Sequence, residues 1–394
     1  MPSTRNVTLL TWFGFFSALK FYGPIQIVYF AAATGSYALA GGLMMTVQLA
    51  AALTELPTGI FSDHAGRRLT VLSGALAMTL ALALYASRLS YTILLLGAVC
   101  EGFSRSLFSG NNDAYLYDSL DADGRASEYR AVYSRVSRLS TLSLFISSIG
   151  SGILAALSFD LLIRLTLVAQ LISLAFAFRL RDLAPAHTEK LTLLAHVRAA
   201  LAGLRRNPRL RLLSLSSILG EGIGATAFQY QSAVYHALWP FWAVGLARAL
   251  GEALAVFGFH WSESIIRRVG QARLILVSTI YSWLANLLPA LFPSSITPIL
   301  IPTSALLYGP TASVVEALKQ RDFSPSQRAT MASLNALGAS LFHGLLMLGF
   351  GVVADHIGPI TTLALIQLVF MAVIVVDVRL YRLLRVEGAE MLTR

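Results

Sequence analysis

Long apolar stretches repeat along the whole sequence, and most are close to the roughly 20 residues that an α-helix needs to cross a lipid bilayer. We identify twelve of them, namely residues 7–30, 38–61, 69–88, 91–118, 128–157, 161–180, 209–233, 239–261, 272–292, 296–320, 327–352 and 359–381. Only 13% of the 394 residues are charged, about half the share found in ordinary soluble domains. The sequence therefore predicts an all-α, polytopic membrane protein, and it argues against a soluble enzyme or a disordered chain.

Basic residues gather on one side of these predicted helices. With a cytoplasmic N-terminus, the opposite side of the membrane has only Arg88 and Arg164 as basic residues, each near the end of a predicted helix. An excess of Lys and Arg marks cytoplasmic loops, so both termini are predicted to be cytoplasmic. The preference for Arg over Lys is typical of GC-rich bacterial genomes and indicates the plasma membrane of a bacterium, its inner membrane. This bias also explains the net charge of +10, so we expect no nucleic-acid partner.

The apolar stretches form two groups of six around a long basic segment. We expect an N-terminal six-helix bundle at 1–180, a cytoplasmic linker at 181–208 and a C-terminal six-helix bundle at 209–394. Within the linker, Leu191–Leu204 alternates apolar and basic positions, which is typical of an amphipathic helix lying on a membrane surface.

The two groups share a marker, which indicates a duplicated unit. The sequence GIFSDHAGRR, Gly59–Arg68, follows the second predicted helix, and FHWSESIIRR, Phe259–Arg268, follows the eighth. Aligning the double arginines places Asp63 opposite Glu263, an offset of 200 residues. Internal repeats of this kind are typical of secondary transporters, whose binding sites lie where the repeats meet.

The first marker contains the pattern G-x-x-x-D-x-x-G-R-R. Its residues are Gly59, Asp63, Gly66, Arg67 and Arg68. With this motif, the chain length, the helix number and the central linker, the chain resembles the major facilitator superfamily. The segments Glu55–Gly59 and Ser109–Leu120 look like those of a bacterial subgroup of efflux proteins.

The resemblance implies two six-helix bundles around a central cavity that opens alternately to the two sides of the membrane. It also implies a cytoplasmic gate, in which Asp63 lies at a helix N-terminus and Arg67 or Arg68 pairs with an acid such as Asp113 or Asp118. The alternative is that both arginines only enforce orientation. The predicted gate residues are Glu55, Gly59, Asp63, Gly66, Arg67, Arg68, Asp113, Asp118, Glu263, Arg267, Arg268 and Glu316.

Three features depart from the family pattern. Ala98 occupies the position of the arginine expected in the fourth helix, and Arg105 lies further along. The antiporter pattern of the fifth helix is reduced to Gly150-Ser-Gly152 without a proline. A second G-x-x-x-D-x-x-G run at Gly351–Gly358 has no arginines and is predicted to be a turn that ends a helix.

Ionisable and polar residues inside the predicted helices are candidate site residues, because a charge in the bilayer costs several kcal/mol unless it has a partner or faces a cavity. The predicted cavity residues are Lys20, Tyr22, Gln26, Glu101, Arg105, Asn112, Arg135, Arg138, Glu221, Arg248, Glu252, Asn335 and His343. The charged residues of the N-terminal half are mostly basic and those of the C-terminal half mostly acidic. We therefore expect a cavity that suits a carboxylate or a zwitterion.

Two of the charged pairs have a purely structural alternative. Glu101 with Arg105, and Arg248 with Glu252, are spaced i,i+4 and could be internal salt bridges that only fix helix packing. Lys20 has no acid in its own predicted helix, so Glu101 is its expected partner.

Helical register gives two further expectations. On a continuous first helix, Tyr22 and Gln26 do not share the face of Lys20, so the two sets cannot point the same way. On a continuous fourth helix, Asn112 continues the stripe of Glu101 and Arg105.

Two residues are candidate proton carriers. Glu221 is the first choice because it has no partner in its own helix and because a desolvated carboxyl can titrate near neutral pH. His343 is the rival, since an imidazole titrates near neutrality, although a single His on a helix is more often a packing residue.

These observations predict a secondary transporter working by alternating access, and proton-coupled export of a carboxylate-bearing metabolite, a siderophore-like chelator or a drug. The alternative is a proton- or sodium-coupled uptake symporter for an organic anion or zwitterion. A membrane-embedded enzyme or a channel is less favoured, because the spans show no metal cluster, no nucleophile and base pair, and no symmetric pore segment. We expect no cofactor, a proton gradient as the energy source, a small-molecule substrate, the lipid bilayer as surroundings and a monomer.

Overall fold

A computed structural model describes the chain except residues 1, 110, 183–206, 323–324 and 393–394. Most of the predicted linker, including Leu191–Leu204, is therefore outside the described residues, and so is the side chain of Asp63. The described part of the chain consists of helices, turns and loops without a strand. Nine of its helical segments are long and apolar enough to cross a membrane.

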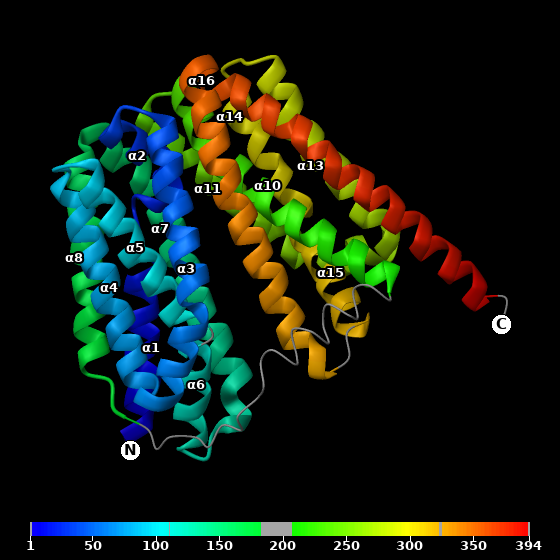
Figure 1. Cartoon of the computed structure of the whole chain (residues 1–394). Helices are drawn as coiled ribbons and strands as arrows, with labels where there is room; N and C mark the ends of the chain where they lie inside the picture. Colours follow the sequence, from blue (N-terminus) through cyan, green and yellow to red (C-terminus); the bar gives the residue numbers. More distant parts are fainter. Residues whose placement is uncertain (1, 110, 183–206, 323–324, 393–394) are drawn as a thin grey trace. The chain divides into compact units, whose positions relative to one another are not determined.

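Contacts divide the chain into two compact units, which are described separately. Unit 1 contains Met1–Glu189 and Phe241–Leu246, and unit 2 contains Lys190–Pro240 and Ala247–Arg394. The helices of unit 1 (Figure 1) are α1 (Pro2–Ala18), η1 (Gly23–Ile25), α2 (Gln26–Thr34), α3 (Tyr37–Ala65), α4 (Arg67–Ser87), α5 (Tyr91–Phe108), α6 (Asn111–Asp121), η2 (Ala126–Glu128), α7 (Tyr129–Leu157) and α8 (Phe159–Phe178). The remaining helices are α10 (Pro208–Leu238), α11 (Phe241–His260), which begins with the six residues grouped with unit 1, α12 (Ser262–Val269), α13 (Gln271–Leu291), α14 (Thr297–Leu300), η3 (Ile301–Leu307), α15 (Tyr308–Asp322) and α16 (Pro325–Leu392).

All twelve predicted spans fall on these helices, but some are not continuous. The span 7–30 is divided into α1, η1 and α2, and the span 91–118 is divided at Ser109 into α5 and α6. The last two spans, 327–352 and 359–381, both lie in α16, which has one non-helical residue at Gly358. The broken first span and the polar α10 are not among the nine segments that meet the length and composition limits.

Polar side chains begin several of the long helices. The first free backbone N–H groups of α3, α5, α8 and α10 are bound by side-chain oxygens of the preceding residue, which are those of Ser36, Ser90, Ser158 and Asn207. Such caps satisfy donors that would otherwise lack a partner.

Three glycines make the same sharp turn between helices. Gly66 joins α3 to α4 at φ 85° and ψ 160°, Gly270 joins α12 to α13 at φ 84° and ψ 144°, and Gly358 divides α16 at φ 77° and ψ 165°. Positive φ strains any residue with a Cβ. The run that ends at Gly358 is therefore a helix-ending turn, as predicted.

The shared turn corrects the alignment of the two markers. Gly66 corresponds in conformation to Gly270, so the offset is 204 residues and not 200. Arg67 and Arg68 begin α4, whereas Arg267 and Arg268 lie in the last turn of α12. The predicted equivalence of the double arginines is therefore wrong, because one extra helical turn precedes Gly270.

Each unit has its own apolar core. In unit 1, α1, α4, α6 and α8 pack around Leu9, Leu10, Phe13, Val71, Ala75, Tyr115, Leu116, Leu174, Ala177 and Leu180. In unit 2, α10, α13, α15 and α16 pack around Leu213, Leu274, Ile275, Val314, Leu318 and Leu380. Gly102 lets α5 lie close to α3, since a Cβ there would be 2.4 Å from the carbonyl oxygen of Val47.

Candidate functional site

The first predicted span is broken where it carries its charge. Lys20 follows the end of α1 at Ala18, and the backbone from Leu19 to Tyr22 makes tight turns before η1 begins. Pro24 accounts for the break, because proline lacks an N–H and its ring clashes with the carbonyl four residues earlier, here that of Lys20. The Gly23-Pro24 pair was the sequence signal for this break.

A buried carboxylate lies beside the break. Glu101 on α5 is 0% exposed. Its Oε1 accepts a hydrogen bond from the Arg105 guanidinium at 2.7 Å, and its Oε2 accepts one from the Tyr85 hydroxyl at 2.9 Å. The ammonium of Lys20 lies near enough to interact with both charges of this pair. The structure thus brings together Lys20, Glu101 and Arg105, but among the described residues the ion pair of Glu101 is with Arg105 and not with Lys20, its expected partner.

The break also corrects the expectation about Tyr22. Tyr22 is 1% exposed and approaches the carboxylate of Glu101, as Lys20 does. The prediction that these residues cannot point the same way assumed a continuous helix, and the turns at 19–22 remove that register. The Tyr22 ring packs against Tyr29, Phe30 and Tyr85.

The cluster carries one positive charge more than it neutralises. The cluster contains two cations, Lys20 and Arg105, and one carboxylate, Glu101. Arg105 neutralises Glu101 in an i,i+4 ion pair. Among the described residues, Lys20 forms no ion pair within 4.0 Å. A cation without a partner in apolar surroundings is suited to binding an anionic group.

Among the described residues, four other predicted cavity residues of unit 1 make no hydrogen bond or ion pair with this cluster. Asn112 is on α6 and not on α5, so the predicted continuous stripe is wrong. The cause is the interruption of the helix at Ser109. Arg135 and Arg138 are exposed on α7, and Arg138 donates to the carbonyl oxygen of Ser134 in its own helix. Gln26 is buried at the start of α2.

Unit 2 holds a second polar cluster around a buried guanidinium. Arg248 on α11 is 4% exposed and donates to the carbonyl oxygen of Phe228 at 2.6 Å and to the Gln231 side chain at 3.4 Å. Its guanidinium carbon lies 3.8 Å from the centre of the Phe228 ring. Gln231 donates in turn to Asn286 on α13 at 2.9 Å. Sequence reasoning did not single out Gln231 or Asn286, although their place inside the predicted spans 209–233 and 272–292 was the available signal.

The candidate proton carriers lie in different surroundings. Glu221 has a side chain that is 59% exposed, and its carboxylate lies 4.0 Å from the ammonium of Lys319 on α15. His343 is 5% exposed, with Nδ1 3.0 Å from the hydroxyl of Thr226. Asn335 is 4% exposed, and Glu252 is half-buried on α11.

Sequence reasoning missed a buried carboxyl in unit 2. Asp377 on the second half of α16 is 2% exposed. It accepts hydrogen bonds from the hydroxyls of Ser216 at 2.5 Å and Thr279 at 2.6 Å. An acid within the last predicted span, four residues before its end, was the available signal.

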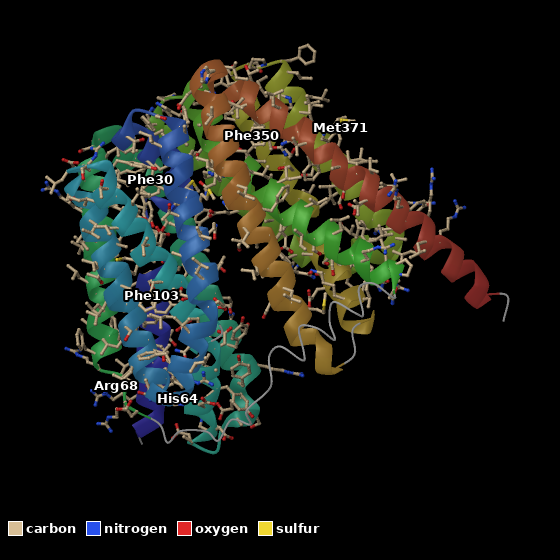
Figure 2. The ribbon with its side chains drawn as sticks, viewed as in Figure 1. Phe30, His64, Arg68, Phe103, Phe350 and Met371 are labelled. Carbon is tan, nitrogen blue, oxygen red and sulfur yellow. The ribbon has the colours of Figure 1, made fainter. Side chains whose placement is uncertain are left out.

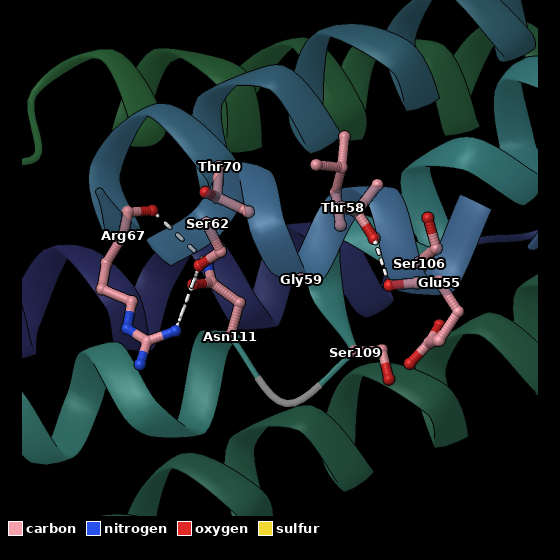
Figure 3. A pocket seen from close by; sticks show the side chains of 10 residues that line it. Glu55, Thr58, Gly59, Ser62, Arg67, Thr70, Ser106, Ser109 and Asn111 are labelled. Carbon is pink, nitrogen blue, oxygen red and sulfur yellow. Dashed lines mark hydrogen bonds between the residues drawn. The ribbon is translucent and has the colours of Figure 1, made fainter. Parts of the chain in front are cut away.

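The motif residues build a polar network at the end of unit 1 where α3 meets α4. Figure 2 places Arg68 and His64 at this end. Arg67 Nε lies 3.4 Å from Asp118 on α6. Arg67 Nη1 donates to Ser62 at 3.1 Å and to Asn111 at 3.3 Å, two residues that lie beside it in Figure 3. Ser62 also donates to Asn111 at 2.8 Å. Asn111 therefore joins α3, α4 and α6.

Not every predicted gate contact forms. Arg68 pairs with Asp182 at 3.2 Å. Asp113 is exposed and forms no ion pair among the described residues, so only Asp118 of the two suggested acids pairs with an arginine of the motif. Glu316 is exposed on α15, and α12 presents exposed residues, which are Glu263, Arg267 and Arg268.

A pocket of about 160 Å³ opens beside this network. Its lining (Figure 3) consists of Glu55, Thr58, Gly59, Ser62, Arg67, Thr70, Ser106, Leu107, Ser109 and Asn111. Hydroxyls dominate it, and Glu55 supplies its carboxylate. Over the described part of the chain, no group of three or more His, Cys, Asp or Glu residues is placed to hold a metal ion.

Comparisons with known proteins agree with the geometry. The family model of the Major Facilitator Superfamily matches residues 7–345. The structure is similar to the nucleoside transporter NupG, with a TM-score of 0.78, 14% identity and coverage of 97% of this chain and 99% of that one. It is also similar to the POT family transporter PepTSo, with a TM-score of 0.75, 12% identity and coverage of 97% and 98%.

A third similar structure is a variant of the E. coli fucose:proton symporter FucP, with a TM-score of 0.58, 13% identity and coverage of 96% and 99%. At such identities these likenesses concern the fold. No curated protein matches the sequence.

Proposed function

This chain belongs to the Major Facilitator Superfamily and is a multi-pass secondary transporter, and we propose that it exports a small carboxylate-bearing molecule in exchange for protons. The inner membrane of a bacterium, cytoplasmic termini and a monomeric state belong to the same proposal. One observation carries the substrate class: in unit 1, a break in the first span places Lys20 next to a Glu101–Arg105 pair, and no described residue forms an ion pair with Lys20.

The chemistry of this cluster favours an anionic group of the substrate. Arg105 and Lys20 supply two cations against one carboxylate, so the cluster has one excess positive charge beside the fully buried Glu101. A substrate carboxylate would neutralise Lys20 and accept charge-assisted hydrogen bonds. Tyr85 and Arg105 hold Glu101 in place, so the carboxylate does not have to reorganise on binding.

The network at the end of α3 supports a gate. Arg67 connects α3, α4 and α6 through Ser62, Asn111 and Asp118, and we propose that these contacts break when the cytoplasmic side opens. Export rests on the resemblance to bacterial efflux proteins. The alternative is uptake by symport, the kind of transport for which the fucose:proton symporter FucP is named.

Everted membrane vesicles test the proposal. The vesicles are acidified inside, a pH dye is read, and a panel of drugs, amino acids and organic acids is added. We expect an organic acid to dissipate the gradient only when the protein is present. We expect Lys20→Ala to lower that rate at least 10-fold, which is roughly 1.4 kcal/mol of lost binding, at unchanged protein level. Arg164→Ala removes an exposed cation of α8 and serves as the matched control.

The outcomes separate the alternatives. An uptake symporter responds instead in right-side-out vesicles with acid outside. A wild-type rate in Lys20→Ala contradicts the substrate site. Transport of a radiolabelled acid without any proton movement contradicts proton coupling.

A further inference from the structure

Asp377 lies at a point where three helices of unit 2 meet. Its two carboxyl oxygens accept hydrogen bonds from Ser216 on α10 at 2.5 Å and from Thr279 on α13 at 2.6 Å. Ser216 and Thr279 are each eight residues into their helices, which places the carboxyl about 12 Å from the helix ends at 1.5 Å per residue. Asp377 is 2% exposed, so this carboxyl is removed from solvent.

No cation compensates this carboxyl. Among the described residues, Asp377 forms no ion pair, and its only hydrogen bonds come from the two hydroxyls. Among the described side chains, the charged and titratable ones within two helical turns on α10, α13 and α16 are those of Arg209, Arg211, Glu221, Arg273, Tyr281, Arg379, Tyr381 and Arg382, and those on the neighbouring α15 are Tyr308, Glu316 and Lys319. None of them contacts Asp377. An uncompensated carboxylate costs several kcal/mol in such surroundings, so a bound cation would stabilise this arrangement.

The two hydroxyls can hydrogen-bond to Asp377 both when its carboxyl is ionised and when it is protonated. The Thr279 hydroxyl also lies 2.9 Å from the carbonyl oxygen of Ile275. When Asp377 is ionised, both hydroxyls donate to it. When Asp377 takes up a proton, its own O–H can donate to Thr279 while Thr279 donates to Ile275, so every group keeps a partner. The same carboxylate, hydroxyl and carbonyl oxygens are hard ligands of the kind that Na⁺ also accepts.

An apolar layer separates the site from the N-terminal ends of α10 and α13. Leu213, Ile275 and Leu380 lie one helical turn from Ser216, Thr279 and Asp377, respectively. All three belong to the core cluster of unit 2. A cation at Asp377 therefore cannot leave past this layer unless α10, α13 and α16 shift, as the helices of an alternating-access transporter do.

We propose that Asp377, Ser216 and Thr279 form the binding site of the coupling cation, a proton or Na⁺. Its role in transport rests on the proposed function, but its occupancy does not. Glu221, the carboxyl preferred on sequence grounds, is 59% exposed and has Lys319 at 4.0 Å. Asp377 is the better-isolated of the two groups.

Infrared difference spectroscopy of the purified protein tests the site without a substrate. A step from acid to alkaline pH converts a protonated carboxyl to a carboxylate, and we expect a C=O stretching band that is present in the wild type and lost in Asp377→Asn. In a second arm, NaCl replaces choline chloride at constant pH. A sodium site changes the carboxylate bands only with NaCl, whereas a proton site gives the pH-dependent band with either salt.

Matched variants complete the experiment. Asp160→Asn removes an exposed acid of α8 that pairs with Arg88, and we expect it to keep the band. Glu221→Gln should keep it as well. If Asp377→Asn does not fold, the Ser216→Ala and Thr279→Val variants must shift the midpoint of the wild-type band, because each removes one hydroxyl partner.

Two results overturn the proposal. If the spectra of wild type and Asp377→Asn are identical in both arms, Asp377 exchanges no cation. If the midpoint of the band is unchanged in both Ser216→Ala and Thr279→Val, the band does not come from a carboxyl bound to these hydroxyls. The vesicle assay with organic acids is independent of these spectra. Its failure would remove the proposed substrate and leave the cation site intact.

Discussion

Glu101 in unit 1 and Asp377 in unit 2 are equally hidden from solvent but have opposite surroundings. Glu101 is 0% exposed and has Arg105 at 2.7 Å and Lys20 nearby. Asp377 is 2% exposed, and within the described part of the chain its hydrogen-bond partners are the hydroxyls of Ser216 and Thr279 alone. Burial alone therefore does not assign a role to an acid. The partners do, because a cation fixes a carboxylate in its charged state and hydroxyls leave its charge free to change.

The difference separates two tasks within one chain. A carboxylate permanently paired with Arg105 can position cations for a substrate. A carboxyl that has only hydroxyl partners can bind and release a small cation. The following variants, in decreasing order of expected effect, test whether the two acids differ as described.

Arg105→Ala is expected to have the largest effect. It leaves Glu101 buried without its ion-pair partner, and we expect a loss of about 3 kcal/mol in unfolding free energy, the lower end for broken buried pairs. Lys20 compensates part of the charge. Thermal melting in detergent measures the change. The double variant Glu101→Gln with Arg105→Gln should recover most of the loss, and equal melting of Arg105→Ala and wild type would remove the basis of the comparison.

Asp377→Ala should destabilise the protein less. It leaves two half-buried hydroxyls without this acceptor, which costs about 1 kcal/mol, the lower end for a polar group left without its partner, and the Thr279 hydroxyl still has the carbonyl oxygen of Ile275. Asp377→Asn, which keeps an acceptor oxygen, should melt closer to wild type. If Asp377→Asn melts as low as Arg105→Ala, then Asp377 is a structural charge like Glu101.

Thr279→Val removes one hydrogen bond to Asp377 and keeps the side-chain volume. We expect a loss of about 0.5–1.5 kcal/mol, read from the same melting curves. Thr70→Val is a matched control, since its hydroxyl donates only to the carbonyl oxygen of Gly66 in its own turn of helix. Equal shifts for both variants would mean that the contact with Asp377 adds nothing.

Lys319→Ala should have the smallest effect. The Lys319–Glu221 contact is at the 4.0 Å limit, and the side chain of Glu221 is 59% exposed. The Lys319 side chain is only 13% exposed, but with a long contact and an exposed carboxylate we expect no more than the roughly 0–1 kcal/mol of surface ion pairs, so the melting temperature should hardly change. A loss of stability comparable to that of Arg105→Ala would show that Glu221 depends on its cation as strongly as Glu101 does. Such a result would restore Glu221 as the leading proton carrier.

Local sequence predicted much of unit 1 correctly. The spacing of Glu101 and Arg105 fixed their ion pair, because residues four apart lie on one face of a helix. The expectation for Tyr22 was wrong, since Pro24 breaks the first span. The predicted stripe from Glu101 to Asn112 was also wrong, because the helix is interrupted at Ser109. Both errors arose from assuming that a long apolar stretch is one straight helix.

Unit 2 was harder to predict because its important contacts join distant parts of the chain. Ser216, Thr279 and Asp377 are separated by 161 and 98 residues in their two contacts. Neutral hydroxyls give no signal in a sequence. The equivalence of Arg67 and Arg267 was wrong as well, because one extra turn before Gly270 moves the arginines to the end of α12.

The sequence alone determined the membrane character, the helical class and the family, since apolar length and the motif at Gly59–Arg68 are properties of contiguous residues. The turn at Gly358 was likewise written in a local run. The tertiary structure decided which buried acid has a cation and which has hydroxyls. Electrostatic interactions depend on distances of a few ångströms between side chains, and those distances exist only after the helices have packed.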